Sequence, residues 1–299
     1  MKTNLKTLSL ALLASGAMAA GSAYALDSVT SKFVPGQNTW SDDSAEFLID
    51  AAPGGTAGVL DVGDYLVGMI KITSFPTSAN PSPATANEFT AIFVTELLSA
   101  PVALGTGIPC GGAVLASCST LEFGAASAGF NSVWTSLGFP AFTNSDGSVL
   151  DPNAAVVVLE GGVHDFARET AGGVPAALAT AINGANVVMV LGLTDPADHW
   201  TGVAPTNLAE TLLRTPGAGV GNFDLDLTIL NESFAGWDFD PNVVGSGTVQ
   251  RPTTGSAFDG FGFYDDTTIT VNMHRVPEPA TLGLLGLGLL GLGLARRKA

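Results

Sequence analysis

Alternation of apolar and polar side chains along the middle of the chain predicts antiparallel β-strands. The alternation is plainest in Phe223–Ile229 and in Thr268–His274, and residues 64–72 and 88–98 show it as well. Successive side chains of a strand point to opposite faces, so each of these segments offers one apolar face to a core. Clusters of Gly, Pro, Asn and Asp separate the segments and are typical of turns.

Two further segments, Ala155–Leu159 and Val187–Leu191, are continuously apolar. Such runs fit either central strands that are covered on both faces or buried helix, and the pattern leaves both open. Few helices are expected: one over residues 207–214, which opens with a capping-box pattern, and one over Val174–Ile182. The predicted fold class is mainly β, an antiparallel sandwich-like domain with one or two short helices.

The N-terminus has the three parts of a secretory signal peptide. Lys2 and Lys6 precede Leu8–Ala20, an uncharged run of 13 residues, and Ala23 and Ala25 supply the small residues that signal peptidase requires. Thirteen helical residues rise only about 20 Å, which is short of a hydrocarbon core of about 30 Å. The sequence therefore predicts a signal helix that is cleaved after Ala25 and a mature chain that is exported.

Three elements follow one another at the C-terminus: a Pro-Glu-Pro motif, sixteen uncharged residues, and a basic cluster. They are Pro277, Glu278 and Pro279; residues 280–295; and Arg296, Arg297 and Lys298. The apolar stretch is a marginal hydrophobic helix, about 24 Å long, and the basic cluster holds its end on the cytoplasmic side. The prolines keep the motif extended in front of it.

This tail resembles the PEP-CTERM sorting signal, which is also catalogued under an ice-binding name that implies nothing about ice. The resemblance implies cleavage by an exosortase after a stage in which residues 280–295 anchor the chain in the inner membrane. It also implies export to the outer surface or extracellular matrix of a Gram-negative bacterium. We therefore divide the chain into a signal peptide (1–25), an exported domain (26–275) and a sorting segment (276–299).

The exported part is strongly acidic. Between residues 26 and 276, six Lys and Arg stand against 26 Asp and Glu, a formal charge of −20. A chain with so few cationic side chains is not expected to bind nucleic acid, because phosphate contacts need them. An acidic surface attracts divalent cations, although it also serves solubility alone.

The only cysteines, Cys110 and Cys118, are separated by seven residues. In an exported chain such a pair is most simply a disulfide that closes a small loop. A two-cysteine metal site would need histidine partners, and none is evident nearby.

Asp238, Asp240 and Asn242 have the spacing that opens a calcium-binding loop. An EF-hand also needs glycine at the sixth position and glutamate at the twelfth, where this chain has Val243 and Val249. These three residues are thus a candidate for an irregular Ca²⁺ site, the one cofactor that the sequence suggests.

Histidine and tryptophan offer weaker candidates. The three histidines are far apart in sequence, which favours isolated surface or structural roles over a metal site; they are His164, His199 and His274. The four tryptophans are interpreted as core residues, with stacking on sugar rings as the alternative; they are Trp40, Trp134, Trp200 and Trp237.

The exported domain has no Gly-x-Ser-x-Gly, His-Glu-x-x-His or P-loop motif, so we expect a protein that is not an enzyme. The predicted role is structural: a cell-surface or biofilm-matrix protein that associates with exopolysaccharide, bridged by divalent cations. One alternative is a calcium- or carbohydrate-binding adhesin. The other is a secreted hydrolase of matrix polymers that uses a pair of its many carboxylates.

Overall fold

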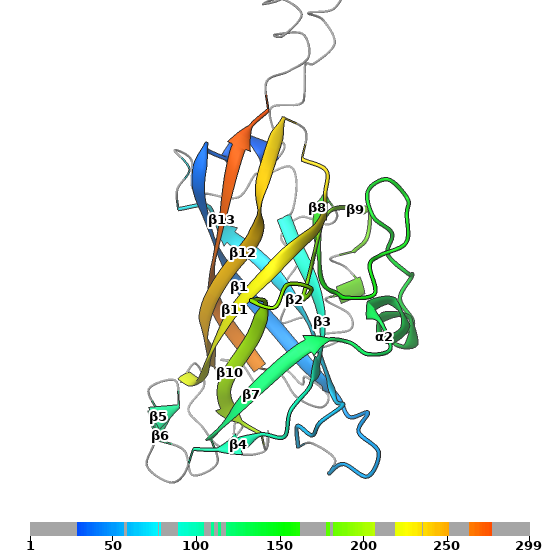
Figure 1. The fold of residues 1–299 in the computed structure, drawn as a ribbon, viewed down its shortest axis with the longest axis vertical. Coiled ribbons are helices and arrows are strands. Elements are labelled where there is room, and N and C mark those ends of the chain that lie inside the picture. The colour runs from blue at the N-terminus through cyan, green and yellow to red at the C-terminus, as the bar shows by residue number, and fades with distance from the viewer. Residues whose placement is uncertain are drawn as a thin grey trace, which may run out of the picture.

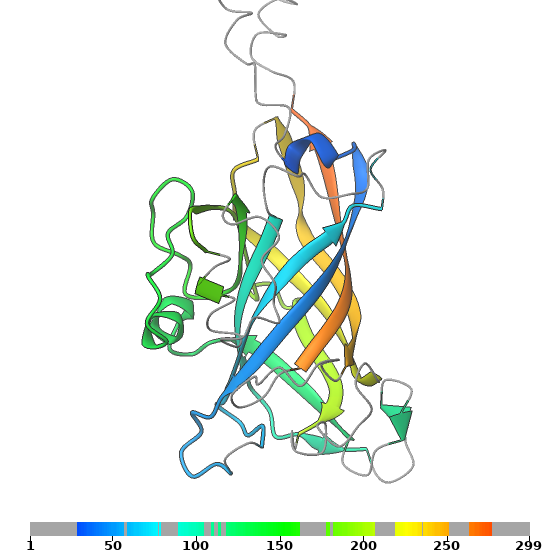
Figure 2. The same ribbon diagram turned by 180° about the vertical axis from the view of Figure 1, so that it is seen from behind.

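Long antiparallel strands make up most of the described protein (Figures 1 and 2). The computed structural model describes residues 29–56, 59–76, 78, 89–104, 109–110, 113–114, 118–161, 178–179, 182–206, 219–234, 236–250 and 263–276. Its elements are η1 (Val29–Lys32), β1 (Gly36–Ile49), β2 (Tyr65–Ser74), β3 (Phe89–Leu97), β4 (Val102–Ala103), β5 (Pro109–Cys110), β6 (Ala113–Val114), β7 (Cys118–Ala125), α2 (Phe130–Ser136), β8 (Ala154–Gly161), β9 (Ala185–Gly192), β10 (His199–Pro205), β11 (Gly219–Glu232), β12 (Trp237–Gln250) and β13 (Phe263–Arg275). The predicted mainly antiparallel β-fold is confirmed.

One sheet contains all of these strands except the small β5–β6 pair, and it closes on itself. Its order is β12-β13-β1-β2-β3-β8-β9-β11-β10-β7-β4, and β12 also pairs with β11. The faces that pack against each other across the core therefore belong to one curled sheet. The predicted terminal helices lie outside the described residues.

Between β3 and β11 the sheet branches into two strand pairs, β8–β9 and β7–β10, which lie one above the other. Residues 89–93 of β3 pair with β8, and residues 95–97 pair with β7. On β11, residues 228–232 pair with β9 and residues 222–226 pair with β10. This branching gives the sheet an upper part with β8 and β9 and a lower part with β7 and β10 (Figure 1).

The enclosed face carries the largest apolar core of the described residues. The period-two pattern of β3 places Phe89, Ala91 and Phe93 in this core, and that of β13 places Ile269, Val271 and Met273 there. The two alternating patterns read from the sequence are thereby confirmed.

The second core lies on the outer face of the upper part of the sheet, under α2. Ile92 and Val94 of β3 and Val157 of β8 pack there against Phe130 and Trp134 of α2. Because β8 and β9 are covered on both faces, their sequences are continuously apolar, and Ala155–Leu159 and Val187–Leu191 are strands rather than helix.

Helix α2 was not anticipated from the sequence. It begins after Gly129, whose φ of +81° suits glycine, and its apolar residues Phe130, Val133 and Trp134 follow helical spacing. That spacing was the available signal. The predicted helix at residues 207–214, and most of the one at Val174–Ile182, lie outside the described residues.

Aromatic side chains close the upper end of the enclosed core. Phe33, just after η1, stacks on Trp40 at 6.0 Å between ring centroids and meets Phe234 and Trp237 edge-on at 5.3 and 5.7 Å. This packing holds η1 at the end of the sheet where β13 also finishes (Figure 2). The described chain therefore begins and ends at the same end of the molecule.

Candidate functional site

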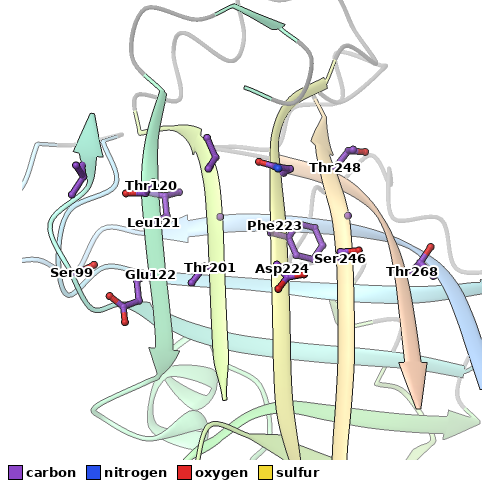
Figure 3. Close-up of a pocket in the computed structure, with 15 residues that line it drawn as sticks. Ser99, Thr120, Leu121, Glu122, Thr201, Phe223, Asp224, Ser246, Thr248 and Thr268 are labelled. Atoms are coloured by element: carbon purple, nitrogen blue, oxygen red, sulfur yellow. The ribbon is translucent and has the colours of Figure 1, made fainter. Parts of the chain in front are cut away.

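An open groove crosses the outer face of β7, β10, β11, β12 and β13 (Figure 3). Of these strands, β7 and β10 form the lower part of the sheet (Figure 1). Its volume is about 940 Å³, and Ser99 and Val102 of the β4 region contribute to its lining. Most outward positions of the five strands carry polar side chains, with Val203 as an apolar exception; the polar ones are Thr120, Glu122, Thr201, Asn222, Asp224, Ser246, Thr248 and Thr268.

Strand pairing places five of these side chains in one row across the sheet. Glu122 is opposite Thr201, Thr201 is opposite Asp224, Asp224 is opposite Ser246, and Ser246 is opposite Thr268. Neighbouring strands are about 4.8 Å apart, so the row spans about 19 Å. The groove thus presents a regular line of hydroxyl and carboxylate groups.

Several of these groups are left available by the rest of the described protein. The hydroxyls of Thr201, Ser246 and Thr268 and the carboxylate of Glu122 make no side-chain hydrogen bond to any residue in the described ranges. Other hydroxyl groups of the described protein do make hydrogen bonds; the Thr135 hydroxyl, for example, donates to the Asn131 carbonyl at 2.7 Å. These four side chains can therefore exchange hydrogen bonds with solvent or with a ligand.

Asp224 is the groove carboxylate with a fixed partner. Its Oδ2 atom lies 2.9 Å from Nε2 of His199, whose Nδ1 lies 3.0 Å from the carbonyl oxygen of Ala197. The hydrogen bond to Asp224 is the larger cause, and together with the contact to Ala197 it raises the pKa of His199 above its ordinary value. Below that pKa both ring nitrogens donate, and the imidazolium partly neutralises the carboxylate at the centre of the row.

Electrostatically the groove suits ligands that are not anionic. Its described lining holds Glu122 and Asp224 but no Lys or Arg. Carboxylates accept hydrogen bonds from hydroxyl groups, and Ser and Thr hydroxyls both donate and accept. The arrangement can therefore bind a hydroxyl-rich, uncharged molecule, whereas it repels phosphate, sulfate or carboxylate groups.

Two of the three calcium candidates, Asp240 and Asn242, make side-chain hydrogen bonds in the described structure. Asp240 Oδ1 lies 3.1 Å from Nε2 of His274, and the Asn242 amide donates to Asp226 at 3.0 Å. Within the described ranges, no group of three or more His, Cys, Asp or Glu side chains is placed to hold a metal ion. These contacts use Oδ1 of Asp240 and the amide nitrogen of Asn242, and a Ca²⁺ site at Asp238, Asp240 and Asn242 stays a prediction.

The four tryptophans are core residues, which confirms the interpretation favoured from the sequence. Trp40, Trp134, Trp200 and Trp237 are all at most 6% exposed, so none is available to stack on a sugar. Of the histidines, His199 and His274 each pair with an aspartate on the surface. His164 lies outside the described residues.

Cys118, at the start of β7, is buried and is not a free thiol. The side chain of Cys110 lies outside the described part of the chain. Its bond to Cys118 is therefore not seen directly and stays a prediction.

The residues of the two terminal signals also lie outside the described ranges, from Ala23 and Ala25 at one end to the basic cluster at the other. The described chain reaches Val276, whose amide donates to the carbonyl of Gly236 at 3.0 Å. Among the described helices, none is long and apolar enough to cross a membrane.

Sequence reasoning missed the groove and also a polar run inside the sheet. Asp42, Ser44 and Glu46 alternate along β1 on the enclosed face, each at most 2% exposed, and the Ser44 hydroxyl donates to Glu46. Alternation within residues 40–48 was a signal for a strand. It did not show that the polar side chains are the ones that turn inward.

Comparison with known families decides the role of the tail. The PEP-CTERM protein-sorting motif matches residues 275–298.

The tail is a PEP-CTERM sorting signal.

The resemblance noted from the sequence is thereby confirmed, and the signal indicates an exported, membrane-transiting protein that an exosortase processes. The match begins at Arg275, the last residue of β13, and covers no other residue of the β-domain. Neither a curated protein nor a solved structure matches this chain.

Proposed function

We propose that this protein is a non-enzymatic structural component of the outer cell surface or the extracellular polysaccharide matrix. The observation that carries the proposal is that the sorting signal directly follows the β-domain in the chain. Strand β13 ends at Arg275, and the match to the sorting motif begins at the same residue. The β-domain is therefore the cargo that the PEP-CTERM signal delivers.

The fold supports a role in which the domain is attached by one end. The Arg275 guanidinium lies 4.8 Å from the ring centroid of Trp237, and the Val276 amide is bonded to Gly236, so the last strand is held up to the edge of the signal. The groove is lined in part by β7 and β10. These strands form the lower part of the sheet, whereas β13 ends at the top (Figure 1). A domain held at its C-terminal end would turn the groove away from the attachment point.

Deleting residues 277–299 tests the sorting role. We expect the truncated protein to appear in the medium and to be lost from the matrix fraction of the producing cells. A matched variant that replaces only Arg296, Arg297 and Lys298 with Ala keeps the apolar stretch and tests the orientation signal separately. Unchanged matrix retention of the truncated protein would overturn the proposal.

The intact mass of the processed protein, from cells with and without the exosortase, tests the cut itself. We expect a chain that starts near residue 26 and ends near Pro277–Pro279 only when the enzyme is present. Additional mass on that chain would identify an attached glycan or lipid. A chain that ends at Ala299 in both strains would make the tail a plain anchor.

A calcium-binding role is the proposal's cofactor-dependent form, in which Ca²⁺ bridges the acidic surface to the matrix. It predicts a higher melting temperature in millimolar Ca²⁺, an effect that the D238N/D240N variant loses. An unchanged melting temperature would remove this form and leave sorting intact.

The hydrolase alternative is tested on the same material. Incubation with polysaccharide from the matrix should release no reducing ends. Release that disappears in E122Q would replace the structural proposal with a hydrolytic one, because Glu122 and Asp224 are the carboxylates of the groove.

A further inference from the structure

We propose that the outer groove binds an uncharged polysaccharide, which lies across the strands along the row from Glu122 to Thr268. The inference rests on the proposed function and deepens it, because it names the site and the chemical class of matrix component that the domain holds. It assigns a binding role to residues that no sequence motif singled out.

The first support is the hydrogen-bonding chemistry of the row. Thr201, Ser246 and Thr268 offer hydroxyls that donate and accept, and Glu122 and Asp224 accept only. Each of these groups stands on a different strand, and the strands fix their spacing at about 4.8 Å. A chain of sugar units presents hydroxyls at repeated intervals and so matches a repeated line of such groups.

The second support is that the protein has not used these groups itself. Four of the five residues in the row, all except Asp224, make no side-chain hydrogen bond within the described ranges. Asp224 keeps one oxygen for His199, which fixes the orientation of its carboxylate. A rigid sheet with preset polar groups loses little conformational entropy when a ligand binds.

The third support is charge, which selects among polymers. The described lining has carboxylates and no cationic side chain, and the exported part carries a formal charge of −20. An anionic polysaccharide would be repelled. Hydroxyl, amide and carboxylate groups occupy most of the outward positions of the five strands, and Val102, Val203 and Phe223 also line the groove.

The groove's dimensions agree with an extended ligand. A row of about 19 Å is longer than a single sugar, and the groove of about 940 Å³ is open rather than enclosed. With the tryptophans buried, affinity comes from many individually weak hydrogen bonds. We therefore expect weak binding per site that is strengthened when many copies meet one polymer.

The test uses the processed protein purified from the producing cells, with matrix polysaccharide from the same cells separated into uncharged and anionic fractions. Binding is measured by affinity electrophoresis and isothermal titration calorimetry. We expect binding to the uncharged fraction and at least tenfold weaker binding to the anionic one.

The triple variant T201V/S246A/T268V removes three hydroxyls and keeps the strand-compatible shapes. We expect its dissociation constant for the uncharged fraction to rise at least tenfold, at an unchanged melting temperature. The control T270V changes the neighbouring outward residue of β13, outside the groove, and should bind like the parent protein.

A pair of aspartate variants provides the second control. Asp224 and Asp240 are both surface carboxylates that contact a histidine, at 2.9 and 3.1 Å, but only Asp224 lines the groove. D224N should weaken binding about threefold to tenfold, and D240N should leave it unchanged. Equal effects of the two changes would overturn the proposal.

Matrix retention separates this inference from the proposed function. If the triple variant binds the uncharged fraction as tightly as the parent, or if the parent binds neither fraction, the groove is not the site. In either case a protein that is still retained in the matrix in a tail-dependent manner leaves the structural proposal standing. If the parent protein is itself not retained in the matrix, the proposed function fails, and the inference loses its basis.

Discussion

The two halves of the sheet's outer face differ in what covers them. On β3, β8 and β9 the outward side chains are apolar, as at Ile92 and Val157, and α2 with its neighbouring loop buries them. On β7 and β10–β12 the outward side chains are largely Thr, Ser, Asn, Asp and Glu, and the groove leaves them open. The same backbone architecture thus serves stability on one half, and on the other it presents polar groups to the surroundings.

The comparison teaches how to locate a candidate site in a protein without catalytic motifs. Burial on both faces explains the continuously apolar strands, since each face has its own core. Where the outer core stops, the outward positions no longer contribute to stability through burial. The residue types at these outward positions can then be set by function or by solubility.

Removing the central side chain of the outer core should have the largest effect. Trp134 is fully buried, stacks on Phe139 at 4.3 Å, and donates from Nε1 to the Pro140 carbonyl at 2.9 Å. W134A should lower the free energy of unfolding by about 3–5 kcal/mol, measured by chemical denaturation. V149A, at a side chain that is 82% exposed, is the control and should change it by less than about 0.5 kcal/mol.

A reciprocal exchange between the two halves should have an intermediate effect. I92T places a hydroxyl in the outer core and removes apolar contacts, which should cost about 2–4 kcal/mol of unfolding free energy. T201I makes the opposite change in the groove and should stay within about 0.5 kcal/mol of the parent. Similar losses from both variants would mean that the two outer faces are not energetically different.

The smallest effect is the pH dependence of the His199–Asp224 pair. The pKa of His199 is raised in the folded protein, so its stabilising contribution is fully present below the unfolded pKa of about 6.5. That contribution is lost as the pH rises through the folded pKa. Both side chains are substantially exposed, so we expect less than about 1 kcal/mol.

An NMR titration of the histidine ring measures this pair directly. D224N should bring the pKa of His199 down towards its ordinary value, because the leading hydrogen bond to a charged group is gone. D240N changes a histidine-paired aspartate on the same surface and should leave the His199 titration unaltered. A His199 titration that is insensitive to D224N would show that Asp224 does not hold the imidazolium.

Particular elements show how far sequence reasoning reached. Period-two patterns identified β11 and β13, and the apolar runs narrowed β8 and β9 to two possibilities that burial then decided. Helix α2 was missed because seven residues with three apolar positions give a faint signal among strands. The polar row was missed because each of its members is an ordinary outward residue of its own strand.

Local chemistry determined what the sequence alone could establish: alternation along single strands, the secretory pattern at the N-terminus, and the three-part sorting signal. Each of these is read over a few neighbouring residues. The tertiary structure decided which strands are neighbours, that β12 closes the sheet against β11, and that Glu122, Thr201 and Asp224 share one row. Strand pairing joins residues that are far apart in the chain, and the packing of both cores selects it, so no short stretch of sequence encodes it.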